Sequence, residues 1–271
     1  MASIDDRRRE FRRLHQTGCF VIPNPWDLGS ARLLAGMGFP ALATTSAGFA
    51  WSQGRADNHV TLDQALDHLR TMVAGVDLPV NADFEGGFAV DPAAVGANVL
   101  RAVGTGIAGI SIEDSTGDAF QPLHDFDLAV ARVRAARSAI DASGTGVVLT
   151  GRSEGYITGR PDLAETIRRL RAYAEAGADC LYAPGLPSRS TIAAVVSAVA
   201  PLPVNVLIGA EGASVADLAA MGVRRISVGG ALARAAWAGF FEAAREIATQ
   251  GTFAALARGA PGAELDRAFA Q

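Results

Sequence analysis

The stretch LPVNADFEGGFAVDPAAVGANVLRAVGTGIAGISIED, residues 78–114, contains one complete structural repeat. A short apolar run, Val80–Phe84, opens it, and a second, Gly109–Glu113, closes it. Between them, Pro92–Val103 has the apolar spacing of a helix, and Asp91 stands where a residue that caps the first turn would stand. This order predicts two parallel strands joined by a helical crossover.

The same alternation extends along the whole chain, and no linker interrupts it. Strands are predicted at Cys19–Pro23, Ala41–Thr45, Val80–Phe84, Gly109–Glu113, Val147–Gly151, Cys180–Ala183, Val204–Leu207 and Arg225–Val228. Helices are predicted at Trp26–Gly36, Leu62–Val76, Pro92–Val103, Asp127–Ser143, Asp162–Ala176, Arg189–Val199 and Val215–Met221, with Thr61, Asp91 and Ser214 as N-caps and Gly36, Gly104, Gly177 and Gly222 as C-terminal caps.

Eight repeats favour a closed (β/α)8 TIM barrel over an open doubly wound sheet. The chain has 271 residues, and one such barrel takes roughly 250. We therefore predict one domain over residues 1–271, with an Ala-rich helical extension over residues 231–271 that packs against another subunit.

Composition excludes several classes of protein. Hydrophobic residues make up 49% of the chain and charged residues 19%, which favours a sizeable core over disorder. The net charge is −4, and the basic run Arg7–Arg13 is interpreted as a solvated helix face, so we expect no nucleic-acid partner. We find no signal peptide and no run of 18 apolar residues, so we expect a soluble, cytoplasmic protein without a membrane partner.

The basic and sulfur-containing residues limit the chemistry further. All 24 Lys and Arg residues are Arg, so no lysine can form a Schiff base with a carbonyl substrate. An enzyme of this sequence that breaks carbon–carbon bonds would need a metal or a cofactor as its electron sink. The two cysteines, Cys19 and Cys180, form neither a disulfide framework nor a cysteine-based zinc site, and Cys180 is expected to be a buried, inert thiol.

Polar residues at the predicted strand ends are the candidates for chemistry, because active sites of barrels lie at the carboxyl ends of the strands. Asp83 and Glu85 are two residues apart, which in a strand puts them on one face, and Glu113 ends the neighbouring strand. Three carboxylates there suit a hard cation with oxygen ligands. The alternative is that these acids cap helices or pair with arginine.

The other strand ends offer groups that could bind a substrate. Arg152 presents a planar fork that matches a carboxylate, or else forms an internal salt bridge to Glu154 or Glu113. The segment Thr44–Gly48 has hydroxyls and backbone N–H groups for a carboxylate or a 2-oxo group, and it is expected to end a strand and lead into a loop that continues to Asp57. Asn205 could point into the barrel.

These pieces, in this order and spacing, resemble the isocitrate lyase/phosphoenolpyruvate mutase superfamily. The matching segments are Pro23–Asp27, Thr44–Gly48, Gly54 to Asp57, Asn81–Gly87, Ile112–Asp114, Arg152 and Ser227–Gly230. The resemblance implies a barrel whose last helix is exchanged with a neighbouring subunit, a homo-oligomer (dimer or tetramer), and Mg²⁺, with Mn²⁺ as an alternative. It also implies a small 2-oxo or hydroxy acid as the substrate.

The resemblance also assigns roles. The metal ligands would be Asp83, Glu85 and Glu113; the substrate-binding residues Ser46, Ala47, Gly48 and Arg152; and the catalytic residues Asp57 and Arg152. From their positions on a strand and on the loop after Glu113, we add Asn205 as a substrate-binding candidate and Ser115 as a catalytic candidate. The metal would stabilise an enolate by acting as a Lewis acid on the 2-oxo oxygen.

One segment departs from the lyases of this superfamily. Their mobile loop carries a cysteine that acts as general acid–base, whereas Asp114–Pro122 here has neither Cys nor Lys. The hydroxyl of Ser115 or Thr116 could take its place. His124 is either an acid–base group or a surface histidine.

These observations favour a Mg²⁺-dependent lyase-type enzyme that cleaves a C–C bond in a small 2-oxo or hydroxy dicarboxylate, with an oxaloacetate-like substrate preferred. The alternatives are a P–C bond mutase or hydrolase acting on a phosphonopyruvate-like substrate, and a 2-oxo acid-binding protein with little turnover.

Overall fold

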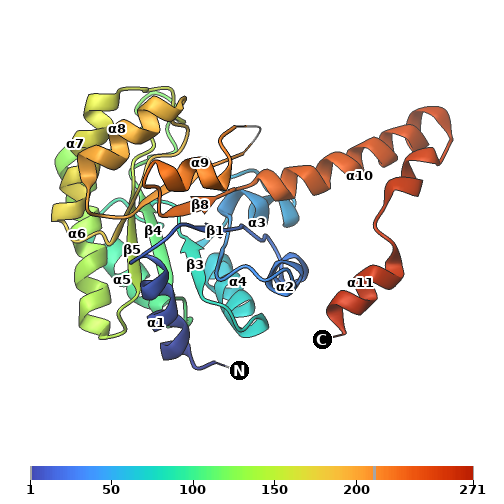
Figure 1. Ribbon diagram of the computed structural model, residues 1–271, viewed down its shortest axis with the longest axis horizontal. Helices are drawn as coiled ribbons and strands as arrows, with labels where there is room; N and C mark the ends of the chain where they lie inside the picture. The colour runs from blue at the N-terminus through green and yellow to red at the C-terminus, as the bar shows by residue number, and fades with distance from the viewer. Residues whose placement is uncertain (1, 210–211, 271) are drawn as a thin grey trace.

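The computed structural model describes residues 2–209 and 212–270, and its centre is one sheet of eight parallel strands (Figure 1). The strands are β1 (Phe20–Ile22), β2 (Leu42–Ala43), β3 (Val80–Asp83), β4 (Gly109–Glu113), β5 (Val148–Arg152), β6 (Cys180–Tyr182), β7 (Val204–Leu207) and β8 (Arg225–Ser227). The strand order is β1-β8-β7-β6-β5-β4-β3-β2, and the N–H of Ala43 donates to the carbonyl of Pro23 (3.1 Å) between β1 and β2. The predicted (β/α)8 barrel is confirmed.

Helices alternate with these strands and cover the sheet. They are α1 (Ile4–Leu14), α2 (Leu28–Gly36), α3 (Ser46–Ser52), α4 (Leu62–Gly75), α5 (Pro92–Val103), α6 (Phe126–Ser143), α7 (Leu163–Glu175), α8 (Arg189–Val199), α9 (Val215–Ala220), α10 (Ala231–Gln250), the 3₁₀ helix η1 (Ala254–Arg258) and α11 (Gly262–Phe269). The predicted helices agree to within two residues at each end. The N-caps Thr61, Asp91 and Ser214 are confirmed, because each side chain accepts the N–H three residues further on.

Two local predictions were wrong. The segment after Thr45 is a helix, α3, rather than a loop, because the hydroxyl of Thr45 accepts the N–H of Gly48 (3.3 Å) and starts a helical turn. Gly36 is the last helical residue of α2, not its cap; Met37 caps the helix, and the left-handed turn falls at Gly38 (φ +84°).

Helix α1 closes the amino-terminal end of the barrel with arginines, which corrects the prediction of a solvated face. Arg8 is only 8% exposed and donates to the carbonyls of Val103 (2.9 Å) and Ile107 (3.0 Å). Arg7 donates to two carbonyls at the end of α4. The basic run therefore caps carbonyl groups of α4, α5 and the α5–β4 turn, and only its remaining arginines face solvent.

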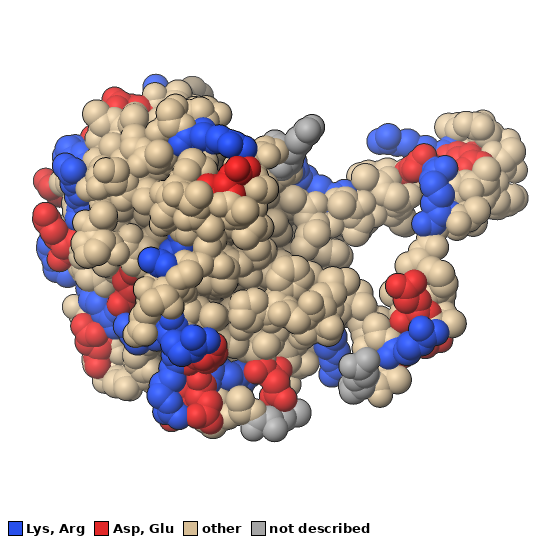
Figure 2. Space-filling model, viewed as in Figure 1, with Lys and Arg blue, Asp and Glu red and all other residues tan. Residues whose placement is uncertain are grey.

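The carboxyl-terminal part extends away from the barrel. Helix α10 projects outward, and after η1 the chain returns so that α11 packs against α2 (Figure 1). On the face drawn in Figure 2, acidic and basic side chains are intermixed, without a continuous basic stripe. Cys180 is fully buried, as predicted. None of the helices in residues 2–209 and 212–270 has the length and apolar character that crossing a bilayer requires.

Candidate active site

A pocket of about 150 Å³ opens at the carboxyl ends of the strands and reaches into the barrel. All eight strands contribute to its lining, which consists of Ile22, Asn24, Ala43, Thr44, Thr45, Ser46, Ala47, Asp57, Asn81, Asp83, Ser111, Arg152, Tyr182, Asn205, Leu207, Arg225, Ser227, Gly229 and Gly230. The volume is below the roughly 300 Å³ at which pockets for drug-sized ligands begin. The pocket therefore suits a compact substrate.

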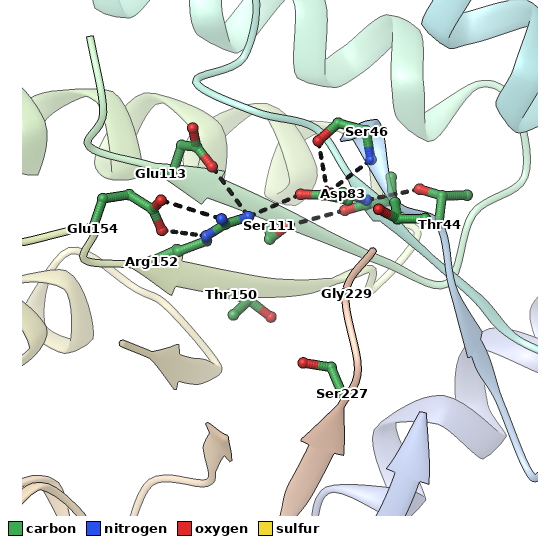
Figure 3. Close-up of polar contacts among 12 residues, drawn as sticks. Thr44, Ser46, Asp83, Ser111, Glu113, Thr150, Arg152, Glu154, Ser227 and Gly229 are labelled. Carbon is green, nitrogen blue, oxygen red and sulfur yellow. Dashed lines mark hydrogen bonds and ion pairs between the residues drawn. The ribbon is translucent and has the colours of Figure 1, made fainter. Parts of the chain in front are cut away.

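Asp83, the last residue of β3, lies at the centre of the polar contacts (Figure 3). Its Oδ2 accepts hydrogen bonds from the N–H and the hydroxyl of Ser46, both at 2.9 Å, and its Oδ1 accepts one from Nη1 of Arg152 at 3.0 Å. The backbone N–H of Asp83 donates to the hydroxyl of Thr44 (2.9 Å). These contacts fix the carboxylate between the start of α3 and the end of β5.

Arg152, the last residue of β5, joins three carboxylates. Besides Asp83, it pairs with Oε2 of Glu113 (3.1 Å) and with both carboxylate oxygens of Glu154. Its guanidinium also lies 5.2 Å from the ring centre of Tyr182. Both internal salt bridges considered for Arg152 are therefore present, and Figure 3 shows the arginine between the acids.

The negative charge of this cluster exceeds what Arg152 can compensate. Burial raises the pKa of Glu113 well above its usual range and that of Glu154 less strongly. Burial and the charges of Asp83 and Asp57 raise the pKa of Glu85 to about 7. For Arg152, burial alone would lower the pKa, but the surrounding carboxylates outweigh it and raise the pKa.

Glu85 does not share a strand face with Asp83 as predicted. Strand β3 ends at Asp83, and Glu85 has a left-handed backbone (φ +47°) in the turn that follows. Glu85 contributes to a smaller, mostly apolar pocket beside the main one, together with Asp83, His68 and Phe49.

The residues fit a divalent cation in charge and in donor type. Carboxylate oxygens are the ligands of hard cations, and Asp83, Glu113 and Glu85 share a region with excess negative charge. Within the described residues, no three acidic, histidine or cysteine side chains converge on one point, because Nη1 of Arg152 lies between Asp83 and Glu113. Binding would therefore require carboxylates to turn from Arg152 toward the ion.

The remaining predicted site residues are only partly brought together. Ser46, Ala47, Asp57 and Asn205 line the main pocket. Two predicted residues do not contribute to that lining: Gly48 is buried within α3, and Ser115 uses its hydroxyl to accept the N–H of Gly117 (3.4 Å).

The loop after β4 is a short hairpin held at its base. The N–H of Thr116 donates to the carbonyl of Pro122 (3.0 Å), and that of His124 donates to the carbonyl of Asp114 (2.9 Å). His124 is only 7% exposed, so the interpretation as a surface histidine was wrong. The carboxylate of Asp114 accepts hydrogen bonds from Arg169 (3.0 Å) and from the hydroxyl of Tyr173 on α7, and also from the backbone N–H of Glu154, just after β5.

Three functional candidates were not assigned a role from the sequence. Glu154 was considered only as a salt-bridge partner of Arg152, and because β5 ends at Arg152 the strand-end rule does not select it. Tyr182 follows the same strand-end rule, but its aromatic ring carried no expected role. Arg225 is the first residue of β8, at the end of the strand where active sites are not sought.

Residues 11–248 match the family described as phosphoenolpyruvate phosphomutase. The chain belongs to this family. The family lies in the phosphoenolpyruvate mutase/isocitrate lyase superfamily, so the resemblance seen in the sequence is confirmed, and with it the prediction of an enzyme that cleaves C–C or P–C bonds.

Relatives of this family member cover most of its length. An uncharacterised protein of Mycobacterium tuberculosis, Rv1998c, is 34% identical over 94% of both chains. Oxaloacetate decarboxylase of Bradyrhizobium diazoefficiens is 30% identical over 71% of this chain and 68% of the relative.

Solved structures of the superfamily superpose closely. A Burkholderia cenocepacia J2315 protein, provisionally described as a lyase or mutase, is 48% identical with a TM-score of 0.95, covering 99% of this chain and 98% of its own. The 2,3-dimethylmalate lyase is 28% identical (TM-score 0.86, coverage 99% and 95%). Oxaloacetate acetylhydrolase, solved with its product oxalate, is 25% identical (TM-score 0.85, coverage 97% and 94%).

Proposed function

We propose that this family member is a Mg²⁺-dependent lyase that cleaves a C–C bond in a small 2-oxo or hydroxy dicarboxylate, with an oxaloacetate-like substrate preferred. The observation that carries the proposal is the cluster of Asp83, Glu113 and Glu154 around Arg152, at the mouth of a pocket of about 150 Å³. The cluster supplies oxygen ligands for a hard cation and one guanidinium for an anionic substrate.

In this proposal Asp83, Glu85 and Glu113 hold the ion, directly or through water. A bound Mg²⁺ would supply Lewis-acid stabilisation of the charge that develops on the substrate's 2-oxo oxygen. Arg152, released in part from its carboxylates, donates to a substrate oxygen, and Ser46 and Ala47 hold a substrate carboxylate on the pocket wall.

Asp57 is the group we assign to proton transfer. It lines the pocket, and partial removal from water together with the charge of Asp83 raises its pKa. When the C–C bond of an oxaloacetate-like substrate breaks, the electron pair stays on the retained carbon, which then needs a proton. The carboxyl group of Asp57 can hold that proton and deliver it from its Oδ atoms.

The comparisons support this substrate class over the alternatives. Oxaloacetate is named for a curated relative and for a solved neighbour, and a dialkylmalate is named for another. The family description keeps phosphonate chemistry as the second candidate. A phosphonate brings more negative charge, and the loop 114–122 offers no lysine to meet it.

A substrate panel tests the proposal. Purified protein with Mg²⁺ is offered oxaloacetate, 2,3-dimethylmalate, methylisocitrate and phosphonopyruvate, and the release of pyruvate, glyoxylate, other 2-oxo acids and phosphate is followed. Turnover of a dicarboxylate supports the lyase. Turnover of phosphonopyruvate alone would replace it with P–C chemistry, and binding of a 2-oxo acid without turnover would leave a binding protein.

Substitution of Asp83 tests the metal site. Asp83→Ala removes the carboxylate at the centre of the cluster, so we expect loss of Mg²⁺ binding by isothermal titration calorimetry and activity below detection. Asp63→Ala is the control, because Asp63 pairs only with Arg101 at the exposed surface. Mg²⁺ binding or activity that survives in Asp83→Ala would show that the site is wrongly assigned.

We also propose a homo-oligomer, a dimer or tetramer in which the part of the chain from residue 231 packs against another copy. Helix α10 supports this assembly because it exposes large apolar side chains away from the barrel, among them Phe240 (59% exposed) and Phe241 (48%).

A further inference from the structure

Arg225 is a buried cation at the floor of the pocket. It is the first residue of β8, it is 3% exposed, and it contributes to the lining of the pocket. Its Nε donates to Oδ1 of Asn205 (2.9 Å), its Nη2 to the hydroxyl of Thr150 (3.0 Å), and its Nη1 lies 3.3 Å from Nε2 of His15. All three partners are uncharged acceptors.

Most other buried arginines have their charge met within the chain. Arg152 pairs with three carboxylates, and Arg169 pairs with Asp114 and Glu165. Arg132 also lacks a carboxylate partner among the described residues, but it donates to three backbone carbonyls and does not contribute to the pocket lining. Arg225 is thus the pocket-lining arginine for which residues 2–209 and 212–270 supply no counter-charge.

His15 does not supply that charge either. Burial and the nearby charge of Arg225 lower its pKa to about 3, so the ring is neutral near pH 7. Its Nδ1 donates to the carbonyl of Phe11 (2.8 Å), which leaves Nε2 as the acceptor that faces Arg225. The floor of the pocket is therefore positive, while the rim around Arg152 is negative.

The two arginines that line the pocket, Arg152 and Arg225, lie at different depths along the barrel. Arg225 bonds to Thr150, which precedes Arg152 by two residues on β5. Two residues of a strand rise by about 6.5 Å, so the guanidinium of Arg225 lies roughly one layer of the barrel below the acid cluster. A compact dicarboxylate that extends from rim to floor spans such a separation.

We infer that Arg225 binds a second anionic group of the substrate at the floor of the pocket, so that the enzyme selects compact dianions over monoanions. A guanidinium has five N–H donors, and three of those of Arg225 are engaged, so donors remain for an incoming carboxylate. A buried cation without a counter-ion is costly, and a bound anion removes that cost. This inference rests on the proposed use of the site for carboxylates. It adds that Arg225 determines how many negative charges the preferred substrate carries.

The first test uses the wild-type protein. Binding of malonate and of pyruvate is measured by isothermal titration calorimetry with Mg²⁺ present. We expect malonate to bind at least tenfold more tightly than pyruvate. Equal affinities, or no binding of either anion, would overturn the inference without any variant.

The second test uses Arg225→Gln and Arg225→Lys. We expect Arg225→Gln to weaken malonate binding at least tenfold and pyruvate binding less than threefold, and Arg225→Lys to recover part of the difference, since it keeps the charge but loses the planar fork. Equal weakening of both anions would mean that Arg225 only organises Asn205 and Thr150. Thermal melting confirms that each variant is folded, and the wild-type comparison decides if neither folds.

Binding and turnover are measured separately, so the proposed lyase activity and the proposed role of Arg225 can each be rejected without the other. Selective, Arg225-dependent binding of malonate without turnover of any dicarboxylate would leave the inference standing and reject the lyase. If a dicarboxylate is turned over and Arg225→Gln still prefers malonate to pyruvate as strongly as the wild type does, the lyase stands and the inference about Arg225 is rejected.

Discussion

The guanidinium of Arg152, at the end of β5, is the shared partner of three carboxylates. Arg152 contacts Asp83, Glu113 and Glu154, and no second arginine shares this task among the described residues. Each carboxylate is therefore undercompensated, which is a poor arrangement for stability but suits the cation site of the proposed function. Under that proposal, Arg152 has a role both in structure and in recognition.

Asp114 illustrates a buried pair whose role is structural. Its carboxylate accepts from Arg169 (3.0 Å) and from the hydroxyl of Tyr173 (2.6 Å), and it is 2% exposed. We expect Asp114→Ala to lower the free energy of unfolding by about 3–5 kcal/mol, because Arg169 would lose its buried partner. Urea denaturation measures the change.

The control for this prediction is Asp67→Ala. Asp67 pairs only with Arg70 on the same helix, and both side chains are more than half exposed. Such a pair contributes less than about 0.5 kcal/mol. Similar losses in the two variants would show that Asp114 does not hold the loop to α7.

Which residues of the site could be predicted depends on their position in the strands. Asp83 and Arg152 end strands, and the rule that barrel sites lie there was enough to find them. Glu85 was misplaced because the two-residue period holds only within a strand, and the backbone turns left-handed two residues after Asp83. Arg225 begins its strand, and only the three-dimensional arrangement of the barrel shows that its side chain reaches the pocket.

At the scale of elements, α3 depends on a close approach that only glycine permits. A Cβ on Gly48 would lie 2.7 Å from Cγ2 of Thr45 and 2.9 Å from Cβ of Trp26. We expect Gly48→Ala to destabilise the protein by about 1–3 kcal/mol and to weaken substrate binding, because α3 must shift and Ser46 moves with it. Thermal melting and substrate titration measure both effects.

Gly36→Ala is the matched control, since it makes the same change at an exposed position, the last residue of α2. A Cβ there meets no atom within 4 Å. We expect no loss of stability, and a gain of up to about 1 kcal/mol from the better helix former. A stable Gly48→Ala variant would mean that α3 has room to adjust.

The elements themselves were largely predictable, and the exception has a physical reason. Strands and long helices carry hydrophobic periods over many residues, so their positions agree to within two residues. Helix α3 has only seven residues, and its start depends on one hydroxyl bond from Thr45. Its sequence, rich in small residues, gives too short a period to distinguish it from a loop.

At the scale of the whole molecule, α10 leaves apolar surface uncovered in one copy of the chain. Phe240→Asp combined with Phe241→Asp places charge on that surface, and we expect the proposed oligomer to dissociate to monomer in sedimentation velocity experiments. Met37→Asp is the control, since Met37 is exposed (69%) on the barrel body and should leave the mass unchanged. A wild-type monomer would contradict the proposed assembly.

The stability of the whole molecule should also depend on pH through His68. Burial lowers the pKa of His68 to about 4 from 6.5 in the unfolded chain, and the ring stacks on Phe49 at 4.0 Å. The unfolded state binds more protons between these values. Stability is therefore complete above pH 6.5 and falls toward pH 4, by about 1.4 kcal/mol per pH unit for this group.

His68→Phe checks this dependence, because it keeps the stacked ring and removes the titrating group. We expect the variant to lose stability less steeply between pH 6.5 and pH 4.5 than the wild type, as measured by urea denaturation. Parallel curves for the two proteins would assign the acid sensitivity to other groups.

In the hairpin after β4, the fold depends on the residues of the base, whereas the residues of the tip can be exchanged. Its base is tied by backbone bonds between Asp114 and His124 and between Thr116 and Pro122, so the barrel depends on the base and not on the tip. Phe120 at the tip is 93% exposed. A protein engineer, or natural selection, can therefore replace residues 117–121 at small cost to the fold. The installation of a new acid–base group there is a short evolutionary step.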